Sequence, residues 1–165
     1  MRRVRPKPLT AEAFASYGDV IEAGAAHERL EINYGATTRF HDLARIDVKD
    51  QDGEPIVSLF RSTPLPQPHT VRILERHPLG SLAFVPLSGH RYLVVVAPPG
   101  ALDPAAIEVF LARPDQGVNY AKGTWHHFSL ALDAVSDFLV IDRAGPGDNL
   151  DEVELAPGDR FEIEL

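Results

Sequence analysis

Cysteine is absent from this 165-residue chain. Its absence excludes thiolate catalysis, thiolate metal sites and a disulfide framework, and it is compatible with a reducing compartment. Long apolar runs are absent too, since none approaches the ~20 residues of a membrane-spanning helix. The basic N-terminus is not followed by an apolar segment of signal-peptide length. We therefore expect a soluble, cytoplasmic protein with no membrane partner.

Positive charge is scarce. The formal net charge is −8, and no stripe rich in lysine or arginine follows the first seven residues. This balance argues against nucleic-acid binding, and it means that any anionic substrate must be captured by a few local cations. With 44% hydrophobic residues, the chain can form one domain over residues 1–165 with a sizeable core.

Helical patterns are rare as well. Thr10 can cap one short helix, which Gly18 would end. Elsewhere, about eight to ten short apolar runs alternate with proline and glycine, which predicts an all-β sandwich or barrel. The turn Ser88-Gly89-His90 predicts a hairpin between the strands 82–87 and 92–97.

The stretch 71–77, VRILERH, holds the most closely spaced ionisable groups. In an extended strand, alternate residues share a face, so Glu75 and His77 would lie side by side. Such a pair can simply be the polar end of an ordinary strand. It becomes informative in combination with a second stretch.

That second stretch is 116–132, QGVNYAKGTWHHFSLAL. Adjacent histidines in a strand point to opposite faces, so only one of His126 and His127 can share a cavity with Phe128. If Glu75, His77 and His126 point into one cavity, they can hold a divalent metal or act as general acid and base. Histidines satisfied by backbone groups in a packed barrel are the structural alternative.

Two arginines are candidates for binding a carboxylate. The stretch 32–43 fits neither the helical nor the strand period of apolar residues. It is therefore an edge strand with a bulge or a loop that brings Asn33, Arg39 and His41 to a pocket. Arg61 shares a strand face with Val57 and Leu59, so it lies at a solvated strand end or lines the barrel interior.

Several motifs resemble those of known proteins. The cupin pattern is matched by His77, Gly89, Gly123 and His126, with glutamate at position 75 in place of the leading histidine. More specifically, the ureidoglycolate lyase family is resembled by AFASYGDVIE (13–22), TTRFHDLA (37–44), ERHPLGSLAFVP (75–86), QGVNYAKGTWHH (116–127) and DFLVIDR (137–143).

This resemblance implies a cupin-like double-stranded β-helix and a homodimer. It also implies a lyase that splits ureidoglycolate into glyoxylate and urea in allantoin degradation, part of purine metabolism. Such an elimination needs a base at the hydroxyl and an acid at the departing nitrogen. We assign this catalysis to Glu75, His77 and His126, with Lys122, four residues before His126, as a fourth catalytic candidate.

The substrate is expected to contact residues from several parts of the chain. Arg39 and Arg61 are the candidates for its carboxylate, with Lys122 as a third cation. Asn119 and Tyr120 could hydrogen-bond its urea group, although such an asparagine more commonly closes a turn.

The chain departs from the family at Leu82, where members commonly carry glutamine and metal cupins carry a carboxylate. A four-ligand metal site is therefore hard to assemble, and we favour acid–base catalysis. A nickel ion held by Glu75, His77 and His126 stays an open alternative.

Three other functions are compatible with these residues. The same substrate could be hydrolysed with release of ammonia, which would make the protein an amidohydrolase. A cupin pocket could also bind a small acid as a non-catalytic sensor, or carry a metal-dependent isomerase or dioxygenase, which Leu82 disfavours.

Overall fold

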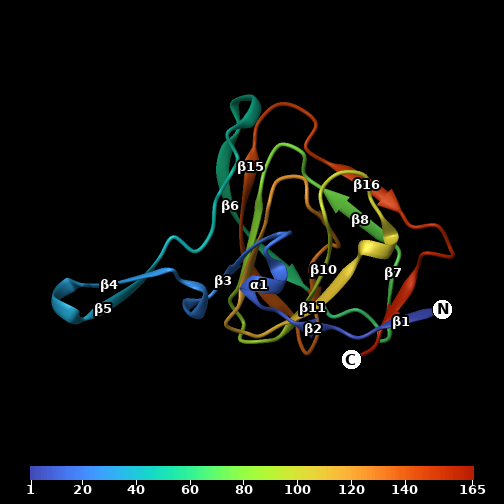
Figure 1. Ribbon diagram of the computed structural model, residues 1–165, viewed down its shortest axis with the longest axis horizontal. Coiled ribbons are helices and arrows are strands. Elements are labelled where there is room, and N and C mark those ends of the chain that lie inside the picture. Colours follow the sequence, from blue (N-terminus) through green and yellow to red (C-terminus); the bar gives the residue numbers. More distant parts are fainter.

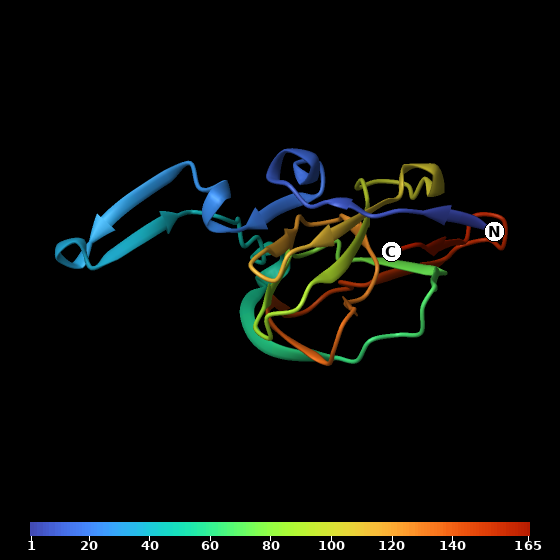
Figure 2. The ribbon, with the colours of Figure 1, turned by 90° about the horizontal axis from the view of Figure 1, so that it is seen from below.

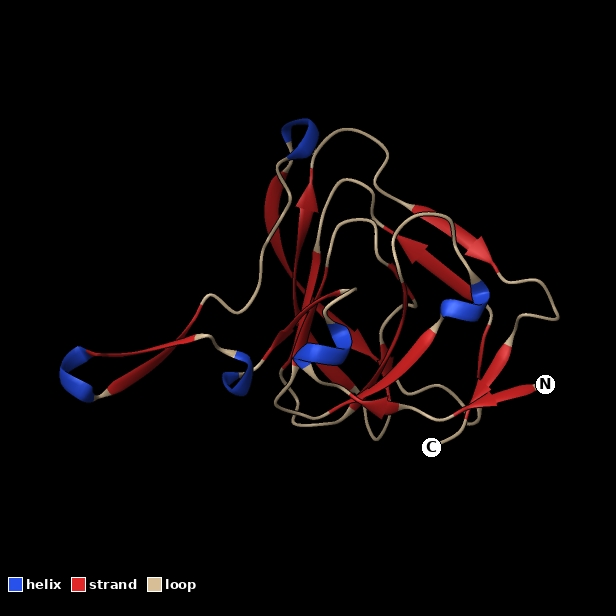
Figure 3. Cartoon of the chain, in the orientation of Figure 1, coloured by secondary structure: helices blue, strands red, loops and turns tan.

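The structure is a computed structural model that describes residues 1–165, and its regular secondary structure consists mainly of short strands joined by loops (Figure 3). The one α-helix, α1 (Ala11–Phe14), begins where Thr10 Oγ1 accepts a hydrogen bond from the Ala13 amide at 3.1 Å. This confirms the predicted cap. The other helices are single 3-10 turns: η1 (Ala23–Ala25), η2 (Asn33–Gly35), η3 (Asp50–Asp52) and η4 (Pro104–Ala106). None of them has the length and hydropathy of a membrane span.

Two sheets face each other and form the body of the molecule (Figure 1). The larger sheet has seven strands: β16 (Asp151–Glu154), β8 (Ile73–Arg76), β13 (Trp125–His126), β10 (Tyr92–Ala97), β11 (Glu108–Ala112) and β2 (Lys7–Pro8) in spatial order, with β14 (Leu130–Ala131) beside β10. The second sheet has five: β3 (Gly18–Ile21), β12 (Gly117–Tyr120), β9 (Leu82–Pro86), β15 (Ser136–Ala144) and β6 (Glu54–Ser62). The predicted all-β, cupin-like fold is confirmed.

Two smaller sheets complete the fold. One joins the chain ends, because β1 (Arg2–Val4) pairs with β17 (Phe161–Ile163), which also pairs with β7 (His69–Val71). The other is an isolated hairpin of β4 (Glu28–Ile32) and β5 (Thr37–His41). Figures 1 and 2 both show this hairpin extending away from the body.

Strand β10 is the centre of the core because both of its faces are buried. One face packs Val94 and Val96 against the five-stranded sheet, in a cluster that includes Phe138 and the helix residue Phe14. The other face packs Val95 into a second cluster with the sheet of the chain ends. A strand buried on both faces needs an unbroken apolar sequence, which explains the run YLVVVA.

The predicted hairpin at Ser88-Gly89-His90 is wrong. Strand β9 pairs with β12 and β15, whereas β10 pairs with β11, β13 and β14, so the two strands belong to opposite sheets. The turn carries the chain from one sheet to the other. Turn composition alone does not separate a hairpin from such a crossing, because both need a residue like Gly89 with positive φ.

Candidate active site

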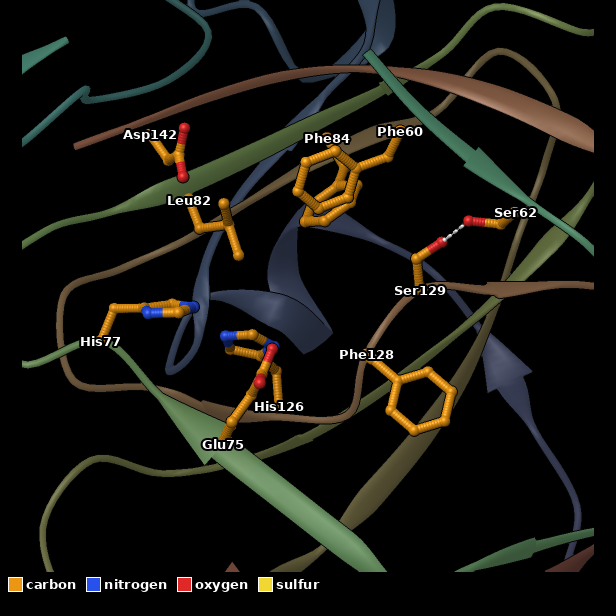
Figure 4. Close-up of a pocket in the computed structure, with 10 residues that line it drawn as sticks. All are labelled: Phe60, Ser62, Glu75, His77, Leu82, Phe84, His126, Phe128, Ser129 and Asp142. Carbon is orange, nitrogen blue, oxygen red and sulfur yellow. Dashed lines mark hydrogen bonds and ion pairs between the residues drawn. The ribbon is translucent and has the colours of Figure 1, made fainter. Parts of the chain in front are cut away.

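Three side chains from the two predicted stretches lie together in a pocket lined by strands of both main sheets (Figure 4). Strand β8 pairs with β13 in a register that sets Glu75 opposite His126. His77 lies two residues beyond Glu75, on the same side, after the strand has ended. One ligand atom from each of the three lies within 4.8 Å of the others. They form a group that could hold a metal ion.

The three residues line a cavity of about 300 Å³, a size suited to a small substrate. Phe60, Phe84, Leu82 and the carboxyl of Asp142 lie on one side of it, and Glu75, His77 and His126 lie across from them (Figure 4). The complete lining is Phe60, Ser62, Glu75, His77, Leu82, Phe84, His126, Phe128, Ser129 and Asp142. It contains two carboxyl groups and no lysine or arginine.

Backbone carbonyls orient both imidazoles. His77 Nδ1 lies 2.8 Å from the Asn149 carbonyl oxygen, and His126 Nδ1 lies 3.2 Å from the His127 carbonyl oxygen. A carbonyl can only accept, so each Nδ1 carries a proton. His126 Nε2 is buried and has no hydrogen-bond partner.

His126 is held in place from several directions. Its side chain is 2% exposed, and the Tyr120 ring stacks on it at 4.4 Å between centroids and 4° between planes. Its Nδ1 also lies 3.8 Å from Glu75 Oε1. Burial lowers the pKa of His126 to about 3, and the neighbouring His77 adds to the shift. The ring is therefore neutral at physiological pH.

The two carboxyl groups of the cavity are shifted in the opposite direction. Burial raises the pKa of Glu75, an effect that Glu152 reinforces and His77 opposes. Burial also raises the pKa of Asp142, and again His77 opposes the shift. Asp142 Oδ1 is buried without a hydrogen-bond partner. The cavity thus holds several acceptors and no lysine or arginine, which favours ligands that donate hydrogen bonds.

The neighbouring histidine faces the other way, as strand parity predicted. His127 Nε2 lies 3.3 Å from His69 Nε2 in a separate cavity. Only His126 shares the candidate site with Phe128, although Phe128 borders both cavities. Burial lowers the pKa of His127 to about 4.

The structure does not bring the other predicted residues into this cavity. Lys122 is paired with Asp50 at 2.6 Å and also lies 3.5 Å from Asp47. Arg61 forms two hydrogen bonds with Asp137, at 2.8 and 3.0 Å, on an exposed strand end. It points away from the pocket because Phe60 and Ser62, its neighbours in β6, take the inward face.

The remaining candidates lie behind the site or far from it. Asn119 is buried and donates to Asp19 Oδ2 at 3.0 Å and to the Arg45 carbonyl at 2.8 Å. Tyr120 is buried against His126 and does not line the cavity. Arg39 is on the projecting hairpin, together with Asn33 and His41, so this stretch is neither a bulged edge strand nor a loop over the chain's own pocket.

Asp142 is the ionisable residue of the cavity that the sequence reasoning missed. It belongs to β15, where Phe138 and Val140 on the same face are buried in the core. The alternation of DFLVIDR places Asp142 on that inward face, and an acid there is the signal that could have identified it.

An all-β, cupin-like fold with two carboxyl groups and two imidazoles in its cavity defines a class of proteins with a metal-binding or acid–base centre. Comparison with known proteins narrows this class, because the model of the family described as ureidoglycolate lyase matches residues 1–164. The chain belongs to the ureidoglycolate lyase family.

Individual relatives agree with that assignment. A ureidoglycolate lyase of Burkholderia mallei (strain NCTC 10229) is 56% identical over 155 residues, covering 94% of this chain and 91% of the relative. One from Burkholderia cepacia is 55% identical over 154 residues, covering 92% and 86%. One from Brucella melitensis biotype 2 is 51% identical over 146 residues, covering 88% and 86%.

Proposed function

We propose that the protein eliminates urea from ureidoglycolate to give glyoxylate, as a lyase of allantoin degradation. The observation that carries this proposal is the convergence of Glu75, His77 and His126, within 4.8 Å of one another, in a small cavity of a member of this family. Acid–base groups at that separation can serve two atoms bound to the same carbon.

The reaction moves one proton. The O–H bond of the hydroxyl and the C–N bond to the ureido nitrogen break, while a C=O bond and a new N–H bond form. Glu75 takes the hydroxyl proton and returns it to the departing nitrogen. Its raised pKa supports both roles, since it makes the carboxylate a stronger base and keeps the proton transferable.

The imidazoles of His77 and His126 hold the substrate in position. The neutral ring of His126 presents Nε2 as an acceptor, and the ureido group supplies N–H donors that such an acceptor binds. Asp142 is a further acceptor on the cavity wall, suited to the terminal amide. The match between a donor-rich ligand group and an acceptor-rich cavity supports the assignment of urea as the leaving group.

A bound divalent metal is compatible with these residues. Glu75, His77 and His126 offer one oxygen and two nitrogens, a donor set that suits nickel, zinc or iron, and both Nδ1 atoms are already bound to carbonyls as in metal-ligating histidines. Such an ion would polarise an oxygen of the substrate. Leu82 supplies no fourth ligand, so acid–base catalysis by the residues themselves stays our preferred mechanism.

The metal is tested by elemental analysis of purified protein and by assays after exhaustive chelation. Full activity without metal would show that the residues themselves supply the acid–base catalysis. Activity that returns only with added nickel would show that the ion is part of the mechanism. Titration of nickel into wild-type and His126→Ala protein, followed by calorimetry, tests the ligand set independently of activity.

Three further properties belong to this proposal. Residues 1–165 act as one domain, the functional unit is a homodimer, and the protein is cytoplasmic. Light scattering of the purified protein tests the dimer, and fractionation of the source cells tests the location.

The reaction is tested by measuring glyoxylate, urea and ammonia from the same sample of ureidoglycolate. We expect glyoxylate and urea in equal amounts and no ammonia. Ammonia and carbon dioxide in place of urea would identify an amidohydrolase. Tight binding without turnover would identify a sensor.

A further inference from the structure

The main sheets do not pack on the projecting hairpin. We call residues 28–41, which comprise β4, η2 and β5, the arm. Its strands pair only with each other, and Figures 1 and 2 show it standing clear of both main sheets. It nevertheless exposes Ile32, Tyr34 and Phe40. A two-stranded hairpin is marginally stable alone, so an arm with exposed apolar side chains indicates a docking partner.

Arg39 is a cation of the arm whose side chain has no partner in its own chain. Strand register places it directly opposite Leu30, with Ile32 and Thr37 on the same face. Arg29 lies on the other face, with its guanidinium 5.4 Å from the centre of the Phe40 ring. Arg39 has no ion-pair partner in its own chain, in contrast to Arg61 and Lys122. Its guanidinium is therefore available to an anion elsewhere.

The cavity lacks the cation that its proposed substrate requires, and this step rests on the proposed function. Ureidoglycolate is an anion, yet the lining contains the carboxyl groups of Glu75 and Asp142, two imidazoles and no lysine or arginine. Like charges at such a site repel one another and disfavour binding of the anion. The pocket of a single chain is thus electrostatically incomplete.

We propose that the arm docks on a second copy of this chain and places Arg39 at the mouth of that copy's pocket, where the guanidinium binds the substrate carboxylate. A second copy of the chain is suited to be the partner because each chain carries both an arm and an incomplete pocket. In a two-fold symmetric dimer, each arm docks at the pocket of the other chain, so both arms are covered at once. Charge and polarity are complementary: Arg39 is flanked by Leu30 and Ile32, whereas the exposed rings of Phe60 and Phe128 border an acidic pocket.

Subunit complementation tests this arrangement. Arg39→Ala and His126→Ala chains are produced together with different tags, and the mixed dimer is purified. Each variant alone should be impaired, Arg39→Ala by about 10- to 100-fold in kcat/KM through a lost charge-assisted contact. In the mixed dimer, the intact pocket of one chain meets the intact arm of the other, so we expect about half of the wild-type activity per dimer.

Arg29→Ala is the matched control, because Arg29 lies on the same arm but on the opposite face. It should retain wild-type kcat/KM, and circular dichroism should show that all variants are folded. Wild-type activity of Arg39→Ala, or a mixed dimer no more active than its parents, overturns the proposal. In the second case Arg39 does not act on the partner's pocket.

A cross-linking experiment decides the docking without any assay of turnover. The chain has no native cysteine, so Ile32→Cys and Phe128→Cys introduce the only thiols. A short bismaleimide should join the two variants when they are co-expressed, at least tenfold more than it joins Arg29→Cys with Phe128→Cys. Equal yields, or a monomer by light scattering, overturn the docking. If wild-type protein forms no glyoxylate, only the proposed function fails, and the cross-linking result stands by itself.

Discussion

The pocket and the arm both contain residues that the sequence marked as candidates, yet the protein holds them in different ways. In the pocket, strand pairing, ring stacking and backbone hydrogen bonds fix His126 from several directions. On the arm, Arg39 is exposed and free of polar partners in its own chain. The comparison teaches that the pocket is preorganised by its own fold, whereas the arm acquires a fixed surrounding only when a partner binds.

Removal of the proton-transferring carboxylate should have the largest effect. Glu75→Gln should lower kcat/KM by about 10²- to 10⁴-fold, because it removes the group that moves the proton from the hydroxyl to the departing nitrogen. His27→Ala, in an exposed segment outside the pocket, is the control and should be fully active. Comparable activities of the two variants in the glyoxylate assay would show that the pocket is not the site of the reaction.

Asp142 should affect substrate binding more than turnover. Asp142→Asn replaces an acceptor oxygen with a donor, so KM should rise about tenfold while kcat changes less. Asp137→Asn lies on the same strand but on the outer face, where it pairs with Arg61, and it should behave as wild type. An unchanged KM for Asp142→Asn would remove its role in binding the ureido group.

The pocket could be predicted from the sequence because it depends on strand parity. Glu75 and His77 lie two residues apart near the end of one strand, and Phe128 lies two residues after His126. Alternation along each segment fixes which side chains can share a cavity. The family motifs covered the same two segments, so both lines of inference led to one set of residues.

Other features of the fold depend on tertiary contacts, which the alternation of residues along a strand does not predict. The turn at Gly89 crosses between sheets instead of closing a hairpin, and its composition is the same in both cases. Lys122 is close to His126 in sequence, but a turn at Gly123 with positive φ separates them, and Lys122 pairs with Asp50. The arm's projection follows from the absence of tertiary contacts, which no local pattern encodes.

The buried histidines should make the metal-free protein less stable in mild acid. The unfolded chain binds protons at its imidazoles near the ordinary pKa of 6.5, whereas burial lowers the folded pKa to about 3 for His126 and about 4 for His127. Stability therefore falls as the pH drops below 6.5, by about 1 kcal/mol per histidine at pH 5.5.

Urea unfolding at pH 7 and pH 5.5 measures this change. His127→Gln should show about half of the loss, since Gln does not titrate. The raised pKa values of Glu75 and Asp142 increase the stability of the folded state as the pH falls further. The comparison is therefore not extended below pH 5.5. Equal stability of the wild type at both pH values would contradict the burial of neutral imidazoles.

The smallest effects are expected for the ion-paired cations outside the pocket. Lys122→Ala and Arg61→Ala each remove an exposed ion pair and no contact with the cavity, so kcat/KM should change less than about twofold. A much larger loss for either variant, with KM raised, would place that cation on the substrate and would weaken the distinction between Arg39 and the other two.

A crystal structure with glyoxylate bound tests the central claim most directly. We expect the aldehyde carbon beside Glu75, His77 and His126, and the carboxylate turned toward the mouth of the pocket at Arg39 of a second copy. Glyoxylate bound elsewhere on the protein, with this cavity filled only by solvent, would contradict the account.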